Sequence, residues 1–288
     1  MARTHWESEA AAAGASVEGA GLVRLALATP TLPPATATNH YFVGWRPMVI
    51  VDPSAPAARD QRRLGAAIDA ARACGAEPAA LLLTHHHRDH AGAAALLRRA
   101  TGLPVWAHAE TARWLQAEVV VDRTVVDGDD VAHNADGAPW LALFTPGHAP
   151  GHLALHQPGS GQVVAGDLVA GEGTILVDPS DGDMGLYLQS LARLEALAPR
   201  SLAPAHGPVQ RDALALLQHY QAHRRAREAR VLEALATTPR PAADLLPTAY
   251  GDVSRLAWPL ALRSMTSHLL HLQRQGLARP VDGGWSLA

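Results

Sequence analysis

The sequence predicts an α/β fold in which two packed sheets lie between outer helices, followed by a smaller helical domain. Short apolar runs alternate with Ala/Leu/Arg stretches of helical length over residues 21–210. Of the 288 residues, 48% are apolar, so the chain can bury a large core. After residue 210, helical patterns dominate and the chain closes on a hairpin signal. We therefore predict a flexible lead-in over 1–20, a large domain over 21–210 and a small domain over 211–288.

In the first half of the chain, strands are predicted where short apolar runs are bounded by Gly, Pro or Asp. These runs cover 22–28, 41–43, 48–51, 79–83, 104–107 and 119–126. Helices are predicted between the strands, where the helix-favouring residues Ala, Leu and Arg recur. These stretches cover 59–74, 91–100 and 110–117. Paired strands followed by alternating strands and helices are typical of a layered α/β fold.

The second half of the chain continues this pattern and then changes. Two more strands, over 141–144 and 162–167, precede an amphipathic helix over 187–197. Beyond residue 210, helical patterns cover 211–235, 242–250 and 259–275. The turn signal Asp282-Gly283-Gly284 then separates two short strand-like runs. Helices followed by a small β-hairpin predict a winged-helix domain.

Four histidines and an aspartate follow directly after the predicted strand 79–83. His85, His87, Asp89 and His90 form an H-x-H-x-D-H pattern on the turn between this strand and the next helix. In an extended segment, side chains two apart point the same way, so His85 and His87 can converge on one ion. Asp89 and His90 follow at the turn into the helix and can face a second ion. Imidazole and carboxylate groups are the ligands expected for zinc and similar divalent metals.

Four other apolar runs end at His or Asp. His148 and His152 lie in the Pro/Gly-rich loop after strand 141–144, Asp167 closes strand 162–167, His206 begins a loop, and Asp52 ends strand 48–51. Taken singly, a strand-terminal Asp is more often a cap or turn residue, and a lone His is usually a surface or hydrogen-bonded residue. His152 is either a further ligand or a residue that supports one, and we favour the supporting role.

Together, these motifs resemble those of the metallo-β-lactamase-fold hydrolases, over about residues 20–210. The resemblance rests on His85-x-His87-x-Asp89-His90, Pro146-Gly147-His148 with Gly151-His152, Gly166-Asp167, and His206-Gly207-Pro208. It implies an αββα sandwich that binds two divalent metal ions, most simply zinc, with manganese or iron as alternatives. By position, it implies that His85, His87 and His148 hold the first ion, that Asp89, His90 and His206 hold the second, and that Asp167 bridges them. Asp52 would then hold a ligating histidine in place.

The resemblance also implies a metal-dependent hydrolase. Two metals about 3.5–4 Å apart can share a hydroxide and clamp the oxygens of a displacement. We therefore expect attack on an electrophilic carbon or phosphorus, with Asp89 and Asp167 as the catalytic carboxylates. A bridging Asp is typical of the phosphodiesterase, ribonuclease and thioesterase branches, whereas true β-lactamases typically lack it. The proton donor to the leaving group stays open between His152 and a water.

The C-terminal region resembles that of the lactamase-β-like protein 2 group, which carries a winged helix. The matching features are His206-Gly207-Pro208, Tyr220, His223-Arg224, Arg227-Glu228 and the terminal helix-Gly-hairpin. Several members of that group are described as endoribonucleases that prefer single-stranded RNA. A tail of this kind would either bind nucleic acid or only shape the active site. The run of Arg224, Arg225, Arg227 and Arg230 is also typical of a solvated helix face.

Three functions stay open on the sequence. The first, which we favour, is hydrolysis of phosphodiesters in single-stranded RNA. The second is hydrolysis of a small thioester or ester, of the hydroxyacylglutathione hydrolase type. The third is a non-enzymatic winged-helix binder with a structural metal site, although a structural zinc site is normally closed by four ligands rather than seven. The low aromatic content of 5% and the absence of Lys weaken the RNA hypothesis.

The composition argues against several other classes of protein. A net charge of −3 is not that of a strongly basic nucleic-acid module. Cys74 is the only cysteine, so neither a disulfide framework nor a Cys-based zinc site can form within one chain. No apolar run reaches the roughly 20 residues needed to span a membrane. The first residues lack the basic and apolar parts of a signal peptide, so we expect a cytoplasmic protein without a membrane partner.

Overall fold

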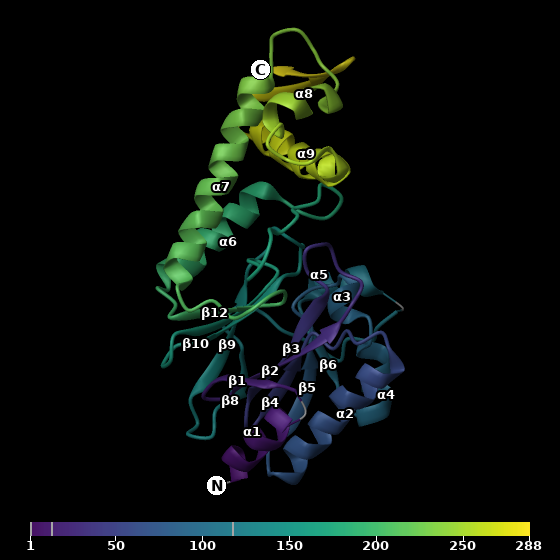
Figure 1. Cartoon of the computed structure of the whole chain (residues 1–288), viewed down its shortest axis with the longest axis vertical. Helices are drawn as coiled ribbons and strands as arrows, with labels where there is room; N and C mark the ends of the chain where they lie inside the picture. Colours follow the sequence, from purple (N-terminus) through teal and green to yellow (C-terminus); the bar gives the residue numbers. More distant parts are fainter. Residues whose placement is uncertain (1, 13, 117) are drawn as a thin grey trace. The chain divides into compact units, whose positions relative to one another are not determined.

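The computed structural model describes residues 2–12, 14–116 and 118–288. The contacts between residues divide the chain into two compact units (Figure 1). The first unit contains both large sheets and consists of residues up to 145, 151–174 and 198–213. The second unit is mostly helical and consists of residues 146–150, 175–197 and 214–288. The domain boundary at 210/211 stays a prediction, and two inner segments of the chain group with the C-terminal region.

Seven strands form the first sheet, and they lie side by side in chain order. They are β1 (Ser16–Gly19), β2 (Leu22–Ala28), β3 (Ala37–Gly44), β4 (Met48–Val51), β5 (Pro78–Leu82), β6 (Val105–Ala107) and β7 (Arg123–Thr124). The strands β1 to β4 pair antiparallel, and β4 to β7 pair parallel. Helices connect the parallel strands, because a parallel pair needs a crossover connection. These helices are α2 (Ala58–Ala73), α3 (Arg88–Ala91), α4 (Ala94–Thr101) and α5 (Ala109–Leu115).

Five strands form the second sheet of the first unit. Their order across the sheet is β12 (Ser201–Pro204), β11 (Gln162–Gly166), β10 (Leu153–Gln157), β9 (Pro139–Phe144) and β8 (Asp130–His133). The pair β11 and β12 is parallel, and the other pairs are antiparallel. Because β11 and β12 run the same way, Asp167 and His206 follow the same edge of this sheet.

The first sheet is buried on both faces. Val51 and Leu82 belong to the core that the first sheet shares with Trp140 and Leu155 of the second sheet. On the opposite face, Ile50 and Leu81 belong to a second core with Leu64 and Ile68 of α2 and Leu97 of α4. Alternate residues of a strand point to opposite faces, so a strand buried on both sides is a continuous apolar run. That is why 48–51 and 79–83 are recognisable as strands in the sequence.

The N-terminal lead-in differs from its prediction. Residues predicted to be flexible form the helix α1 (Ala2–Ala12) and the strand β1. Trp6 is only 2% exposed and packs on the rings of Phe42 and Trp45, with ring centroids 5.6 and 5.9 Å away. An amphipathic helix gains its stability from such packing, which the Ala-rich composition of the segment does not reveal.

Two further elements are shorter than predicted. The strand expected over 119–126 is reduced to β7, since the Asp122 carboxylate accepts the backbone N–H of Val105 at 2.8 Å and bonds Arg98. The helix expected over 91–100 is interrupted between α3 and α4. There the Ala93 N–H donates to the Pro53 carbonyl at 3.0 Å instead of to its own helix.

The second unit consists of helices and a hairpin. Its elements are α6 (Met184–Ala196), α7 (Ala213–Ala234), α8 (Ala242–Ala249), the 3-10 helix η1 (Arg255–Ala257), α9 (Trp258–Arg274), β13 (Ala278–Val281) and β14 (Gly284–Leu287). Val231, Leu245, Met265 and Leu269 are members of its apolar core. Arg240 and Trp285 exchange backbone hydrogen bonds of 3.0 and 2.8 Å, which tie the segment before α8 to the hairpin. The helices and the hairpin follow one another as predicted.

Within the described ranges, no helix combines the length and the apolar character that crossing a membrane requires.

Candidate metal centre

The predicted ligands follow the ends of the strands. His85 and His87 lie in the turn between β5 and α3, and Asp89 and His90 lie in α3. Asp167 follows β11 and His206 follows β12. These six residues belong to the first unit. His148 lies in the segment 146–150, which belongs to the second unit, so its ligand role stays a prediction.

His85 and His87 face each other. The Nε2 atom of His85 lies 2.9 Å from the Nδ1 atom of His87. The other ring nitrogen of His85 lies 3.0 Å from the hydroxyl of Thr84. Two neighbouring imidazoles that converge through one nitrogen each are the arrangement that the x-His-x-His spacing predicts for a shared ion.

A second group of ligands surrounds the carboxylate of Asp167. One oxygen of Asp167 lies 3.5 Å from His90 Nε2, and the other lies 3.4 Å from His206 Nε2. Asp89 approaches the same two nitrogens, at 3.9 Å from His90 and 3.5 Å from His206. His85, His90 and Asp167 form one possible three-ligand group, and Asp89, His90 and His206 form another. The structure therefore gathers two overlapping ligand sets in the first unit, with Asp167 and His90 at their centre.

Asp52 orients two of these histidines. Its Oδ2 atom accepts a hydrogen bond from His90 Nδ1 at 2.8 Å and one from the Thr84 hydroxyl at 2.8 Å. Because the Thr84 hydroxyl donates to Asp52, it can accept from His85 Nδ1. His85 and His90 then both carry their hydrogen on Nδ1 and present Nε2 as a lone pair. Such outer partners fix the tautomer of a metal-ligating histidine, and Asp52 lies where the sequence places it.

His206 is held through contacts that the sequence does not reveal. Its Nδ1 atom lies 3.0 Å from the carbonyl of Ala37, so Nε2 is left as the inward-facing lone pair. The Asn39 side chain donates to the carbonyls of Pro204 and Gly207, at 2.8 and 2.7 Å, on either side of His206. These bonds span 165 and 168 residues, so no local pattern marks Asn39.

Two more residues missed by the sequence analysis support the same region. The Tyr41 hydroxyl donates to the Pro204 carbonyl at 2.7 Å. His40 is fully buried, and burial lowers its pKa to about 4. Its Nε2 atom accepts the Ser54 N–H at 3.1 Å, which holds the chain just after Asp52. The only available signal was their place on one strand, since 39–41 are consecutive polar or aromatic residues in β3.

His152 supports Asp167 and is not placed as a ligand. Its Nε2 atom accepts the backbone N–H of Asp167 at 3.0 Å, and its Nδ1 atom donates to the Thr145 hydroxyl at 2.8 Å. The side chain is completely buried. Because a backbone N–H can only donate, His152 is fixed as the neutral Nδ1–H tautomer. It is therefore not positioned to protonate a leaving group, and that candidate role from the sequence is withdrawn.

The electrostatics of the cluster call for positive charge. Burial lowers the pKa of His90, but the carboxylates of Asp167, Asp52 and Asp89 outweigh it and hold that pKa well above its usual value. Burial raises the pKa of Asp167, but His90 and His206 outweigh it and hold that pKa well below its usual value. His206 likewise has a raised pKa, since Asp167 outweighs burial. The carboxylates therefore favour positive charge at this place, and divalent cations can supply that charge when the histidines are neutral.

These residues fit a metal site. The Nε2 atom of His90 is buried and has no hydrogen-bond partner, although it points at two carboxylates. A buried polar atom without a partner is costly unless something else binds it. Its neighbours are imidazole nitrogens and carboxylate oxygens, which are the ligands preferred by zinc, manganese and iron.

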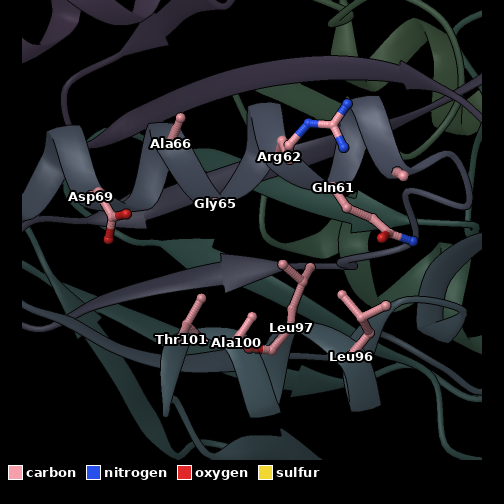
Figure 2. A pocket seen from close by; sticks show the side chains of 10 residues that line it. Gln61, Arg62, Gly65, Ala66, Asp69, Leu96, Leu97, Ala100 and Thr101 are labelled. Carbon is pink, nitrogen blue, oxygen red and sulfur yellow. Dashed lines mark hydrogen bonds between the residues drawn. The ribbon is translucent and has the colours of Figure 1, made fainter.

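Two neighbouring features are not part of this cluster. The His86 ring stacks on Trp114, with ring centroids 4.7 Å apart. A hollow of about 450 Å³ lies between α2 and α4 and is lined by Arg62, Asp69 and Leu96, among other side chains (Figure 2). Among the described residues that line it, there is no predicted ligand.

The fold and the site define an α/β-sandwich protein with a buried His/Asp centre. A model of the metallo-beta-lactamase superfamily matches residues 35–206, and a model of the beta-lactamase associated winged helix domain matches residues 242–285. Because the first match covers more than half of the chain, the chain belongs to the metallo-β-lactamase superfamily. Proteins of this superfamily are typically metal-dependent hydrolases. The predicted sandwich with a C-terminal winged helix is confirmed.

Two curated relatives differ in how much they share with this chain. A beta-lactamase-like protein 2 homolog from Drosophila melanogaster is 28% identical over 214 residues, which cover 69% of this chain and 70% of the relative. A hydroxyacylglutathione hydrolase from Fuscovulum blasticum is 37% identical over 124 residues, which cover 42% of this chain and 45% of the relative. The chain thus spans less than half the length of the second relative.

Solved structures extend the likeness over nearly the whole chain. A beta-lactamase domain protein from Burkholderia ambifaria has a TM-score of 0.81, at 23% identity, and covers 96% of this chain and 94% of its own. That likeness shows the fold. The protein TTHA1623, solved in a di-iron-bound form, is 31% identical with a TM-score of 0.50, and covers 64% of this chain and 94% of its own.

Proposed function

We propose that this chain is a dinuclear metal-dependent hydrolase that cleaves small thioesters. The observation that carries the hydrolase assignment is the orientation of the histidines. In His85, His90 and His206, one ring nitrogen is hydrogen-bonded to an oxygen of the protein, and the other is directed into a cluster with Asp89 and Asp167. A site already organised in this way supports metal binding without further rearrangement.

The proposed ligands are those that the sequence predicts. His85, His87 and His148 would hold one ion, Asp89, His90 and His206 the other, and Asp167 would contact both. Zinc is the proposed metal, and the di-iron-bound relative supports iron as the alternative. When bound, two divalent ions activate water at neutral pH and stabilise negative charge on the substrate oxygen. The carboxylates of Asp89 and Asp167 supply the negative charge that retains the ions.

The substrate class rests on two arginines of α7. Arg224 and Arg227 are 3% and 7% exposed. Arg224 donates to the Ile175 carbonyl and lies over the Tyr187 ring, and Arg227 forms a two-bond pair with Asp252 at 2.8 and 3.1 Å. The guanidinium groups of these two arginines therefore make their contacts inside the second unit and are not positioned to bind phosphates. A net charge of −3 and the likeness to a hydroxyacylglutathione hydrolase support a thioester instead.

Hydrolysis of phosphodiesters in single-stranded RNA is the second candidate. It is favoured by the winged-helix match over residues 242–285, since winged helices occur in nucleic-acid-binding proteins. The match to the Drosophila melanogaster beta-lactamase-like protein 2 homolog supports the same candidate, because several members of that group are described as endoribonucleases. A bridging role of Asp167 would be compatible with both substrates.

The test is a substrate panel on protein of known metal content. We expect turnover of S-lactoylglutathione, with single-stranded RNA and bis-p-nitrophenyl phosphate left intact. The variant His87→Ala should be inactive. The matched control His86→Ala removes the adjacent histidine, which stacks on Trp114, and should retain most of the activity. Cleavage of RNA without thioester turnover would establish the second candidate. Absence of both activities in protein that carries two ions would overturn both candidates and favour a non-enzymatic winged-helix binder with a structural metal site.

A further inference from the structure

His148 is fixed by a neighbour from its own unit. Its Nδ1 atom lies 2.9 Å from the carbonyl oxygen of Leu176. Because a carbonyl can only accept, His148 carries its hydrogen on Nδ1 and keeps Nε2 as a lone pair. The position and the tautomer of this predicted ligand therefore depend on the segment 175–183, which precedes α6 in the second unit.

The loop that carries His148 is itself attached to α6. The Ser190 hydroxyl donates to the Pro146 carbonyl at 2.7 Å, and the Asp183 N–H donates to the Gly147 carbonyl at 2.7 Å. Gly147 has a φ of +135°, and a Cβ atom there would lie 2.2 Å from the backbone nitrogen of Tyr187. The loop 146–150 thus packs so closely on the start of α6 that only glycine fits.

The helices α7 and α9 hold the segment 175–183 at four places. Arg224 of α7 donates to the Ile175 carbonyl, and Ser267 of α9 donates to the Val177 carbonyl at 2.8 Å. Two arginines of α9 also pair with acidic side chains of the segment. The pairs are Arg263 with Asp178, and Arg274 with Asp183.

Arg224 and Ser267 are 3% exposed, so their bonds are shielded from water. Asp183 also caps α6, since its side chain accepts the backbone N–H groups of Gly185 and Leu186 at 2.9 and 3.1 Å. The same residue therefore joins α9, α6 and the His148 loop. These contacts form a continuous path from the C-terminal helices to a predicted metal ligand.

We propose that α7 and α9 position His148 within the second unit, and that they thereby set the affinity for the ion that His148 would bind. Ser267, Arg263 and Arg274 are positioning residues, because they act through the segment 175–183 and not on substrate. This inference rests on the proposed dinuclear function, since it takes His148 as a ligand. It gives the winged-helix region a role that requires no nucleic acid.

The test compares two buried serines of α9. Ser267→Ala removes the bond to Val177, whereas Ser264→Ala removes a bond of 3.2 Å to the Tyr250 hydroxyl in the same unit. Full-length protein is titrated with Zn²⁺ against a chromogenic chelator, and with Co²⁺ to record the absorption spectrum of the bound ion. For Ser267→Ala we expect about tenfold weaker binding of one of the two ions, in line with the effect of outer partners on metal affinity. Ser264→Ala should bind both ions as the wild type does.

A second variant guards against a folding defect. Arg263→Gln with Arg274→Gln breaks the two ion pairs of half-exposed arginines, and should weaken the same ion. Its matched control is Arg230→Gln, which breaks a half-exposed ion pair with Asp252. Wild-type affinity for both ions in Ser267→Ala and in the double variant would overturn the proposal, as would a wild type that binds no ion. A wild type that binds two ions but hydrolyses nothing would overturn the proposed function and leave the positioning role standing.

Discussion

A single carboxylate, that of Asp52, reaches residues predicted to bind two different ions. It contacts His90 directly and His85 through the Thr84 hydroxyl. Its backbone N–H also donates to the Leu82 carbonyl at 2.9 Å, and its φ of +55° lies in the left-handed region that Asp tolerates better than most residues. The end of β4 is therefore shaped to aim this side chain at the neighbouring strand end.

We expect Asp52→Asn to lower the affinity for metal by about 10- to 100-fold, because the amide no longer fixes the histidine tautomers. Competition with a chelator measures the change. The matched control is Asp60→Asn, which alters another buried aspartate of the first unit, paired with Arg63 at the surface. Equal metal affinities of Asp52→Asn and wild type would show that the Asp52 carboxylate is not needed to orient the histidines.

His152 gives a prediction that separates support from proton transfer. We expect His152→Gln to lower activity by the same factor for substrates with good and with poor leaving groups, since the residue holds Asp167 and donates no proton to substrate. The measurement is kcat for a series of esters or thioesters that differ in the pKa of the leaving group. A defect that disappears with the best leaving group would restore His152 as the proton donor.

The sequence predicts the residues of this site better than it predicts their supports. His85, Asp89 and His90 lie in one short motif, and strand and turn geometry alone brings them together. Asn39 and Tyr41 act on a loop more than 160 residues away, and no spacing rule connects them to it. Local pattern therefore reveals candidate ligands, while long-range hydrogen bonds require the folded chain.

At the scale of elements, the turn after β11 is the most constrained connection in the site. Gly166 has a φ of +52°, and a Cβ atom there would lie 2.5 Å from His152 Nε2. The glycine lets the chain turn so that the next residue, Asp167, donates its N–H to that same nitrogen. The Gly-Asp pair is thus a requirement of backbone conformation as well as of metal chemistry.

We expect Gly166→Ala to destabilise the fold by more than Gly102→Ala does. Gly102 also has a positive φ, of +70°, but a Cβ atom there meets nothing within 4 Å. Gly102→Ala should cost about 1–2 kcal/mol from the left-handed conformation alone. Gly166→Ala adds displacement of His152 and should also weaken metal binding. Urea denaturation measures the free energy of unfolding, and equal losses in the two variants would contradict the packing argument.

Strands buried on both faces are the elements that the sequence predicts best. β4 and β5 are apolar throughout, and their bounds agree with the predicted ones to within a residue. The stretch 119–126 is also rich in Val but contains Asp122 and Arg123; it forms only β7, and Val120 and Val126 are 59% and 51% exposed. Composition does not reveal whether a segment packs against other elements on both sides. This packing decides whether the segment forms a strand or a loop.

At the scale of the whole molecule, metal loading should govern thermal stability. The carboxylates of Asp52, Asp89 and Asp167 lie close together, and a ligand that binds only the folded state stabilises it by about 2.7 kcal/mol at 100 times its Kd. For a chain of this size that corresponds to a rise in Tm of about 5–10 °C. Differential scanning calorimetry with and without a chelator measures it. The control Asp167→Ala should show a much smaller shift, and an unchanged Tm in the wild type would argue against a metal bound in the native state.

The two hydrogen bonds that the Asn39 side chain donates to the carbonyls of Pro204 and Gly207 also have a consequence for how the protein is made. Asn39 emerges from the ribosome early, whereas Pro204 and Gly207, its hydrogen-bond acceptors, are among the later residues to emerge. At about 5–20 residues per second, the wait between them is roughly 10–30 s. During that interval the Asn39 side chain lacks these two acceptors, and the nascent chain lacks His206. Translation must therefore pass residue 207 before the second predicted ion can be captured, so metal uptake comes late in synthesis.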